Sequence, residues 1–211
     1  VIHGVRRLRG ADHAVIPDRI EAATFIALGA ITRSPITVTG VRCDHLLAFF
    51  DVMRQMGVGL QRRGTSVTVV PPARPKPCDL VTLPYPAFPT DAQAQVMVLS
   101  ALAEGTSVIT ERIYPDRFMH AAELKRLGAN IQISNAQAVV QGVERLQGAE
   151  IMASDLRASA ALVLAGLAAE GETLLQRIYH IDRGYERIEE RLARLGARIE
   201  RVVTDPAKAP A

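Results

Sequence analysis

The sequence AEGTSVITERIYPDRFMHAAELKRLGA occupies Ala103–Ala129. A similar sequence, AEGETLLQRIYHIDRGYERIEERLARLGA, begins 66 residues later and occupies Ala169–Ala197. A shorter version stands earlier in the chain, as TRSPITV at Thr32–Val38 followed by RQMGV at Arg54–Val58. The glycines in RQMGV, KRLGA and ARLGA follow one another at intervals of 71 and 68 residues. Two landmarks that share one period predict three structural repeats.

Each repeat has the same order of expected elements. An alanine-rich apolar helix comes first, at about 20–31, 92–103 and 157–168. A turn at Pro or Gly leads to a β-branched strand, and an amphipathic helix closed by glycine follows. Short strands end the unit, among them GVERLQG at 142–148 and ARIERVV at 197–203.

The apolar helices decide the layering of the fold. Because the first helix of each unit is apolar almost all round, it must be covered on every side. Its alanines let helix backbones approach closely. We therefore expect an inside-out α/β domain, in which three helices beginning near Ile20, Asp91 and Asp155 are central and the sheets lie outside.

The period also sets expected boundaries. One domain covers 1–203, with repeats at about 11–75, 76–148 and 149–203, and TDPAKAPA at 204–211 is expected to be a flexible tail. GVRRLRG at Gly4–Gly10 matches GVERLQG two periods later, but no helices precede it. The chain is therefore expected to start inside a longer repeat array.

Composition argues against several classes of function. The chain has 211 residues, of which 48% are hydrophobic and 22% charged, as in an ordinary globular protein. The net charge is only +3, Trp is absent, and no basic run alternates with aromatic residues, so a nucleic-acid surface is not expected. The longest near-apolar run, Ala158–Ala169, is too short to span a bilayer. No signal-like segment opens the sequence, which predicts a cytoplasmic location.

Residues suited to metal or nucleophilic chemistry are scattered. The five histidines lack the spacing of metal ligands, and the motifs GxGxxG, GxxxxGK[ST] and HExxH do not occur. Cys43 and Cys78 lack CxxC spacing, which favours two unpaired thiols in a reducing compartment. No metal site is therefore expected.

The candidate chemistry lies at the corners that begin the helices. The apolar helices follow PDRIE, FPTDAQ and SDLRAS, and capping worth about 1 kcal/mol accounts best for Asp18 and Asp155. Arginines in first helical turns oppose the helix dipole; they are Arg19, Arg117, Arg157 and Arg183. Two interpretations stay open. Either equivalent corners such as RIYPDR and RIYHIDR aim their arginines at a common anion, or each arginine pairs with its neighbouring aspartate.

Longer motifs around these corners resemble a known family. PDRIEA, PAFPTDAQAQ, RFMH, ASDLRASAALVLAG and RIYHIDRGYERIEERLARLGA are similar to the UDP-N-acetylglucosamine 1-carboxyvinyltransferases, the enolpyruvyl transferases of the first committed step of peptidoglycan synthesis. The resemblance runs from about Gly4 to Val203. The family fold has two domains, each with three βαβαββ units around buried helices, and the chain resembles the second domain.

The resemblance implies a reaction and a set of partners. The enolpyruvyl group of phosphoenolpyruvate is transferred to the 3-hydroxyl of UDP-N-acetylglucosamine by addition and elimination, and phosphate is released. No metal or organic cofactor is implied. The implied partners are the two substrates and the first domain of the same enzyme, with no nucleic acid and no membrane.

The resemblance also implies roles for individual residues. Asp91 in FPTD matches the base toward the sugar hydroxyl and a ligand of UDP-N-acetylglucosamine. Ile113 matches an aliphatic residue beside the uridine ring. Arg157 and Arg183 match arginines that hold the phosphate and carboxylate of phosphoenolpyruvate, and Arg117 matches a further arginine of the cleft. Arg157 and Arg183 are therefore expected within reach of one common anion.

Two departures from the family limit what this chain does alone. EAAT at Glu21–Thr24 has alanine where the family has glycine. The family's general-acid cysteine and its first-domain lysine and arginine have no match here, and neither Cys43 nor Cys78 fits that cysteine's motif. The isolated chain is therefore expected to be an inactive half of an enzyme.

Rival functions also stay open. A non-catalytic anion-binding or assembly module is one alternative. A related transferase acting on shikimate 3-phosphate and an RNA-cyclase relative are others, and the motifs FPTD and RIYHIDRGYERIE speak against both.

Overall fold

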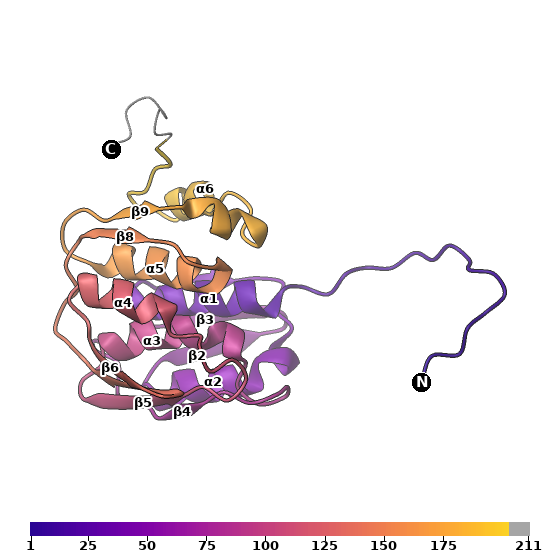
Figure 1. Ribbon diagram of the computed structural model, residues 1–211. Helices are drawn as coiled ribbons and strands as arrows, with labels where there is room; N and C mark the ends of the chain where they lie inside the picture. The colour runs from indigo at the N-terminus through magenta and orange to yellow at the C-terminus, as the bar shows by residue number, and fades with distance from the viewer. Residues whose placement is uncertain (203–211) are drawn as a thin grey trace, which may run out of the picture.

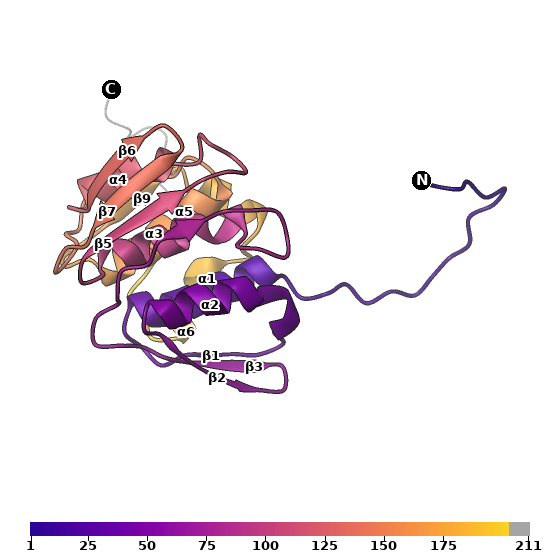
Figure 2. The same cartoon turned by 90° about the horizontal axis from the view of Figure 1, so that it is seen from below.

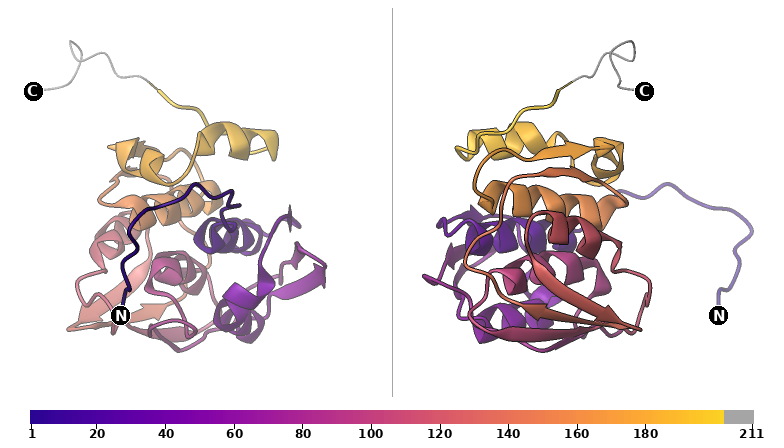
Figure 3. Two further views of the ribbon diagram at one scale, coloured as in Figure 1. Left: turned by 90° about the vertical axis from the view of Figure 1, so that its right-hand side faces the viewer. Right: turned by 60° about the vertical axis from the view of Figure 1, so that its left-hand side comes forward.

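The computed structural model describes residues 1–202, which fold around three central helices (Figure 1). These are α1 (Arg19–Ile31), α3 (Gln93–Ala101) and α5 (Leu156–Ala168), and each contacts the other two. A view along the helices places them side by side with the strands toward the outside (Figure 3, left). The expected inside-out α/β arrangement, with helices beginning near Ile20, Asp91 and Asp155, is confirmed.

Apolar and small side chains explain this central position. Every residue of α3 is buried, and α1 and α5 are buried along most of their length. Small residues let neighbouring elements come close to the helix backbones. A Cβ placed on Gly29 of α1 would lie 3.1 Å from the Val69 Cβ, so the strand that carries Val69 packs directly on this helix.

The middle unit has the complete βαβαββ order. Its elements are β4 (Leu80–Val81), α3, β5 (Thr106–Thr110), α4 (Met119–Arg126), β6 (Asn130–Ser134) and β7 (Gln137–Gln141). The sheet order is β4-β5-β7-β6, in which β4 runs parallel to β5 and the other pairs are antiparallel.

The first and third units follow parts of the same order. The first contains α1, β1 (Thr37–Val38), η1 (Cys43–Leu46), α2 (Leu47–Gln55), β2 (Gly59–Arg63) and β3 (Ser66–Val70), with sheet order β1-β3-β2. The third contains β8 (Glu150–Met152), α5, β9 (Leu174–Gln176), η3 (Ile178–Arg183) and α6 (Ile188–Arg194), and β8 runs parallel to β9. Seen from below, the sheets of the first two units flank the helices on two sides (Figure 2).

The strand expected at 142–148 is wrong. β7 ends at Gln141, and the chain then runs against the end of α3, where the Val143 N–H donates to the Ala101 carbonyl at 2.8 Å. A Cβ on Gly142 would lie only 1.8 Å from the Ala103 carbonyl oxygen. This close approach replaces strand pairing, and only Gln147 forms an isolated bridge, with Glu170.

The strand expected in ARIERVV is also wrong for its described part, residues 197–202. Arg201 forms ion pairs with Asp182 and Glu189 instead of entering a ladder. At the other end, GVRRLRG is fully exposed and runs away from the body (Figure 1), and it pairs with no strand within residues 1–202. The tail expected at 204–211 lies outside the described residues, and the proposed repeat boundaries remain predictions.

Among residues 1–202, no helix is both long enough and apolar enough to cross a membrane.

Candidate active site

Asp91 lies in η2 (Thr90–Ala92), the short turn that leads into α3. The equivalent aspartates of the other two central helices are N-caps. Asp18 accepts a hydrogen bond from the Ile20 N–H at 2.7 Å, and Asp155 accepts one from the Arg157 N–H at 2.8 Å. Within the described chain, Asp91 caps neither η2 nor α3. Capping is therefore confirmed for Asp18 and Asp155, whereas the carboxylate of Asp91 is directed elsewhere.

Two arginines from different units meet on the carboxylate of Asp91. Arg117, which follows β5, places its Nη1 2.5 Å from the Asp91 Oδ1. Arg157, in the first turn of α5, places its Nη2 3.7 Å from the Oδ2. The side chains of the two arginines are only 22% and 18% exposed. We call these three residues the Asp91 cluster. It brings together three of the residues that the sequence singles out.

The cluster tests the two interpretations of the corner arginines. Pairing of each arginine with its neighbouring aspartate is wrong: Arg117 and Arg157 reach Asp91. Asp182 is held by Arg201 at 2.7 Å, and Arg19 lies over the ring of Tyr85. Two of the four corner arginines, Arg117 and Arg157, thus reach one common partner from separate corners. Arg117 and Arg157 meet because their units pack side by side. The spacing of residues along one helix does not bring them together.

The other two predicted residues lie at the surface. Ile113 follows β5 and is 42% exposed, which leaves an apolar side chain free to contact a flat ring. Arg183 ends η3 and is exposed. In residues 1–202, no ion pair joins Arg183 to the Asp91 cluster, so a common anion for Arg157 and Arg183 stays a prediction.

A buried polar network connects the central helices α1 and α3 to the segment between η3 and α6. The Tyr185 hydroxyl, on the segment between η3 and α6, lies 2.8 Å from the Thr24 Oγ1 of α1. The Gln95 Nε2 of α3 donates to the same Thr24 oxygen at 2.9 Å. Burial raises the pKa of Tyr185, while the Thr24 hydrogen bond and the charge of Arg157 on α5 act to lower it. Sequence reasoning missed this network, although Thr24 and Gln95 are polar residues inside otherwise apolar helices.

A second buried polar group, Glu111, lies beneath the loops of the site and is 1% exposed. Its carboxylate accepts hydrogen bonds from the hydroxyls of Thr82 and Thr90 and from the N–H groups of Ile113 and Tyr114. Sequence reasoning missed it too. The available signal was the alternation of strand β5, which turns Ser107, Ile109 and then Glu111 toward the interior.

His120 of α4 is buried next to the cluster. Burial lowers its pKa to about 4, with a smaller raising effect from Asp155 and a lowering effect from the positive charge of Arg117. The imidazole is therefore neutral at physiological pH.

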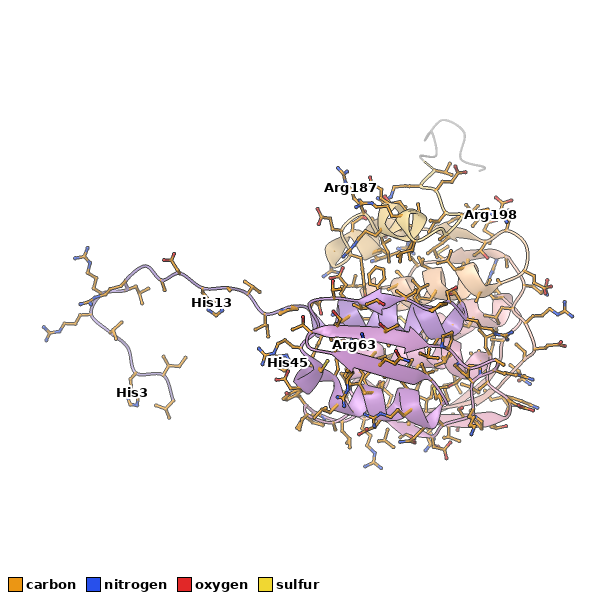
Figure 4. All side chains as sticks on the ribbon, turned by 180° about the vertical axis from the view of Figure 1, so that it is seen from behind. His3, His13, His45, Arg63, Arg187 and Arg198 are labelled. Atoms are coloured by element: carbon orange, nitrogen blue, oxygen red, sulfur yellow. The ribbon has the colours of Figure 1, made fainter. Side chains whose placement is uncertain are left out.

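The histidines and cysteines, which are the residues suited to metal or thiol chemistry, are spread over separate parts of the structure. His3 and His13 lie on the extended N-terminal segment, whereas His45 lies on the folded body (Figure 4). In residues 1–202, no group of three or more His, Cys, Asp or Glu side chains is placed to hold a metal ion. Cys43 and Cys78 are free thiols, as expected, and burial raises the pKa of Cys78.

Comparison with known proteins gives a consistent family signal. The family model described as EPSP synthase (3-phosphoshikimate 1-carboxyvinyltransferase) matches residues 1–192. A UDP-N-acetylglucosamine 1-carboxyvinyltransferase from Anaeromyxobacter sp. (strain K) is 55% identical over 201 residues, which are 95% of this chain and 48% of the relative. One from Akkermansia muciniphila is 51% identical over 207 residues, which are 97% of this chain and 49% of the relative.

A solved structure agrees with the fold. The crystal structure of the enolpyruvyl transferase NikO from Streptomyces tendae is 34% identical with a TM-score of 0.80, covering 87% of this chain and 44% of that chain. The chain spans about half the length of the curated relatives that it matches.

Proposed function

Because the chain belongs to the EPSP synthase family, we propose that it is part of an enzyme that transfers the enolpyruvyl group of phosphoenolpyruvate to the 3-hydroxyl of UDP-N-acetylglucosamine, with release of phosphate. The names of relatives at 51% and 55% identity support this sugar nucleotide as the acceptor. The observation that carries the proposal is the placement of Asp91. Its carboxylate is held by Arg117 and Arg157 instead of serving as a helix cap.

In this reaction Asp91 accepts the proton of the sugar 3-hydroxyl. The hydroxyl oxygen then bonds to C2 of phosphoenolpyruvate while C3 gains a proton from an acid on the half of the enzyme not included in this chain. The resulting ketal loses a proton from C3, its C2–O bond to phosphate breaks, and inorganic phosphate leaves. Asp91 suits the first step because the hydrogen bond from Arg117 orients its carboxylate, with Arg157 3.7 Å from the other oxygen.

The arginines supply the electrostatic part of the mechanism. Arg157 lies in the first turn of α5, so its guanidinium and the positive end of the helix dipole lie together. We assign Arg157 and Arg183 to the phosphate and carboxylate of phosphoenolpyruvate, and Arg117 to the same cleft. Ile113 contacts the uridine ring. Charge that develops on the phosphate is stabilised most by donors that are already in place.

The whole enzyme contains a further half, which supplies the general acid and the opposite wall of the cleft. Without that half, water reaches the Asp91 cluster and weakens its electrostatic action. We therefore propose that the isolated 211-residue chain has no transferase activity. The enzyme acts in the cytoplasm, in peptidoglycan synthesis and hence in cell-wall growth and division.

A chimera tests this function directly. In it, this chain replaces the matching segment of the Anaeromyxobacter relative, and phosphate release is measured with phosphoenolpyruvate and UDP-N-acetylglucosamine. We expect activity in the chimera and none in the isolated chain. The unaltered relative is the positive control, and melting shows whether the chimera is folded.

Two results would contradict the proposal. If the chimera folds but shows no activity while the unaltered relative is active, the transferase function is wrong. That result favours a non-catalytic anion-binding module. A chimera that uses shikimate 3-phosphate instead of the sugar nucleotide keeps the reaction and replaces the acceptor.

A further inference from the structure

Glu111 joins two loops that approach the candidate site from different directions. Its Oε2 accepts a hydrogen bond of 2.9 Å from the hydroxyl of Thr90, the residue immediately before Asp91. Its Oε1 accepts from the Ile113 N–H at 2.9 Å and from the Tyr114 N–H at 3.1 Å. One carboxylate therefore connects the turn that carries Asp91 to the loop that carries Ile113.

A third attachment fixes Glu111 itself. The Thr82 hydroxyl, immediately after β4, donates to the Oε1 of Glu111 at 2.5 Å. The same hydroxyl accepts a hydrogen bond of 3.0 Å from the Arg112 N–H. The segments that follow β4 and β5 are thus tied to each other and to η2 by a single buried carboxylate.

Burying a carboxylate costs free energy unless hydrogen-bond donors replace the water that it loses. The burial of Glu111 therefore requires an explanation. Four donors replace that water here, and hydrogen bonds to an ionised acceptor are stronger than those between neutral groups. The repeat fold alone does not require this group. At the corresponding corner of the third unit, Gln176 and Arg177 are both exposed. Among residues 1–202, Glu111 is the one buried carboxylate, and it lies in the unit that carries Asp91.

We propose that Glu111 is a positioning residue for the transfer reaction: through Thr90 it places Asp91, and through the Ile113 and Tyr114 amides it places the loop that meets the nucleotide. The distance between the base and the nucleotide subsite is then set by one side chain. This role rests on the proposed function. Glu111 is buried beneath the loops and acts through other residues.

The substitution Thr90→Val isolates one arm of this arrangement in the chimera described above. Valine keeps the shape of threonine and removes only the hydrogen bond to the Oε2 of Glu111. We expect kcat to fall roughly tenfold, the equivalent of one hydrogen bond to a charged group, while KM for UDP-N-acetylglucosamine changes less than about twofold. Thr110→Val is the matched control, because within the described residues the hydroxyl of Thr110 accepts a hydrogen bond only from Gln137, on the exposed sheet face.

Two substitutions of Glu111 address the carboxylate itself. In Glu111→Gln, the amide oxygen keeps the three donors of Oε1, and the amide nitrogen donates to the Thr90 hydroxyl, which then acts as acceptor. We expect kcat and KM within about threefold of the parent chimera. In Glu111→Ala, both loops lose their anchor, so kcat should fall and KM for the sugar nucleotide should rise, each by roughly tenfold or more.

The outcomes separate the two proposals. If Thr90→Val keeps the parent kcat, or if folded Glu111→Ala keeps both constants and loses only melting temperature, the positioning role is overturned while the transferase function stands. If Glu111→Ala does not fold, the kcat of Thr90→Val decides, because this substitution removes one hydrogen bond to Glu111. An inactive but folded parent chimera overturns the function, and the role of Glu111 with it.

Discussion

Arg117 donates to Asp91 at 2.5 Å across 26 residues of sequence, and so joins the loop after β5 to the turn before α3. The relationship exists because two corners of one repeat meet at the same end of the central helices. It gives Asp91 an ion-pair partner, whereas in residues 1–202 the aspartates that cap α1 and α5 form no ion pair.

The first prediction concerns Asp91→Asn in the chimera. Asparagine keeps the shape but loses the acceptor for the hydroxyl proton, so turnover should fall roughly 10²–10⁴-fold. Melting should fall only modestly, because the variant loses the charge paired with Arg117 and Arg157 but no helix cap in the described chain. Steady-state kinetics and thermal melts measure both. Asp18→Asn is the control, since asparagine is an equally good N-cap and turnover should survive. Near-normal turnover in stable Asp91→Asn would remove Asp91 from the mechanism.

The second prediction concerns Arg157→Lys. Lysine keeps the positive charge and loses the planar fork that binds phosphate or carboxylate with two hydrogen bonds. We expect KM for phosphoenolpyruvate to rise about tenfold or more, with a smaller change for the sugar nucleotide. Arg126→Lys, at a 59% exposed side chain on α4, is the control and should be neutral. Equal effects on the two substrates would argue against a phosphoenolpyruvate role for Arg157.

The third prediction concerns the buried network. Tyr185→Phe removes the hydroxyl that Thr24 contacts at 2.8 Å. The free energy of unfolding should fall by about 1 kcal/mol, which lowers the melting temperature by roughly 2–4 °C in a domain of this size. Tyr179→Phe, at a 55% exposed residue, should shift melting much less. A melting shift no larger than that of Tyr179→Phe, whose exposed hydroxyl accepts from Arg177, would show that the buried hydrogen bond contributes no more than an exposed one.

The fourth prediction is a pH dependence caused by His120. Its pKa is about 4 in the folded protein, below the ordinary value near 6.5, so only the unfolded chain binds a proton between these values. The free energy of unfolding should therefore fall as pH falls from about 6.5 to 4, by up to about 1.4 kcal/mol per pH unit. Denaturant melts across this range measure the slope. His120→Gln should flatten it, and an unchanged slope would assign the dependence to other groups.

Sequence patterns predicted the fold well because the repeat period and the all-apolar helices are both local signals. They also singled out Asp91, Arg117 and Arg157, which the structure joins. They did not show which corners meet, because that depends on how the units pack. The corners RIYPDR and RIYHIDR differ for a local reason. The second has one additional residue and begins with Arg177 at φ +57°, so it forms η3 and leaves Arg183 exposed.

Glu111 shows a different limit of sequence reasoning. Alternation along β5 predicts that position 111 faces inward. The role of an inward glutamate can be inferred only when its hydrogen-bond donors are known. Those donors come from three separate segments, at Thr82, Thr90 and Ile113–Tyr114. A repeat period of about 70 residues relates equivalent positions in different units. It does not show which loops contact each other within one unit.

The hydrogen bond between Thr24 and Tyr185 spans 161 positions of the chain, and this has a consequence for folding kinetics. Contacts between distant segments form only after the entropy of closing a long loop has been overcome. The middle unit can assemble from neighbouring segments, whereas closure of the three-helix core has to wait for the last unit to dock on the first. During synthesis, α1 therefore leaves the ribosome long before Tyr185 exists, and its apolar surface has no final cover until the third unit has been made.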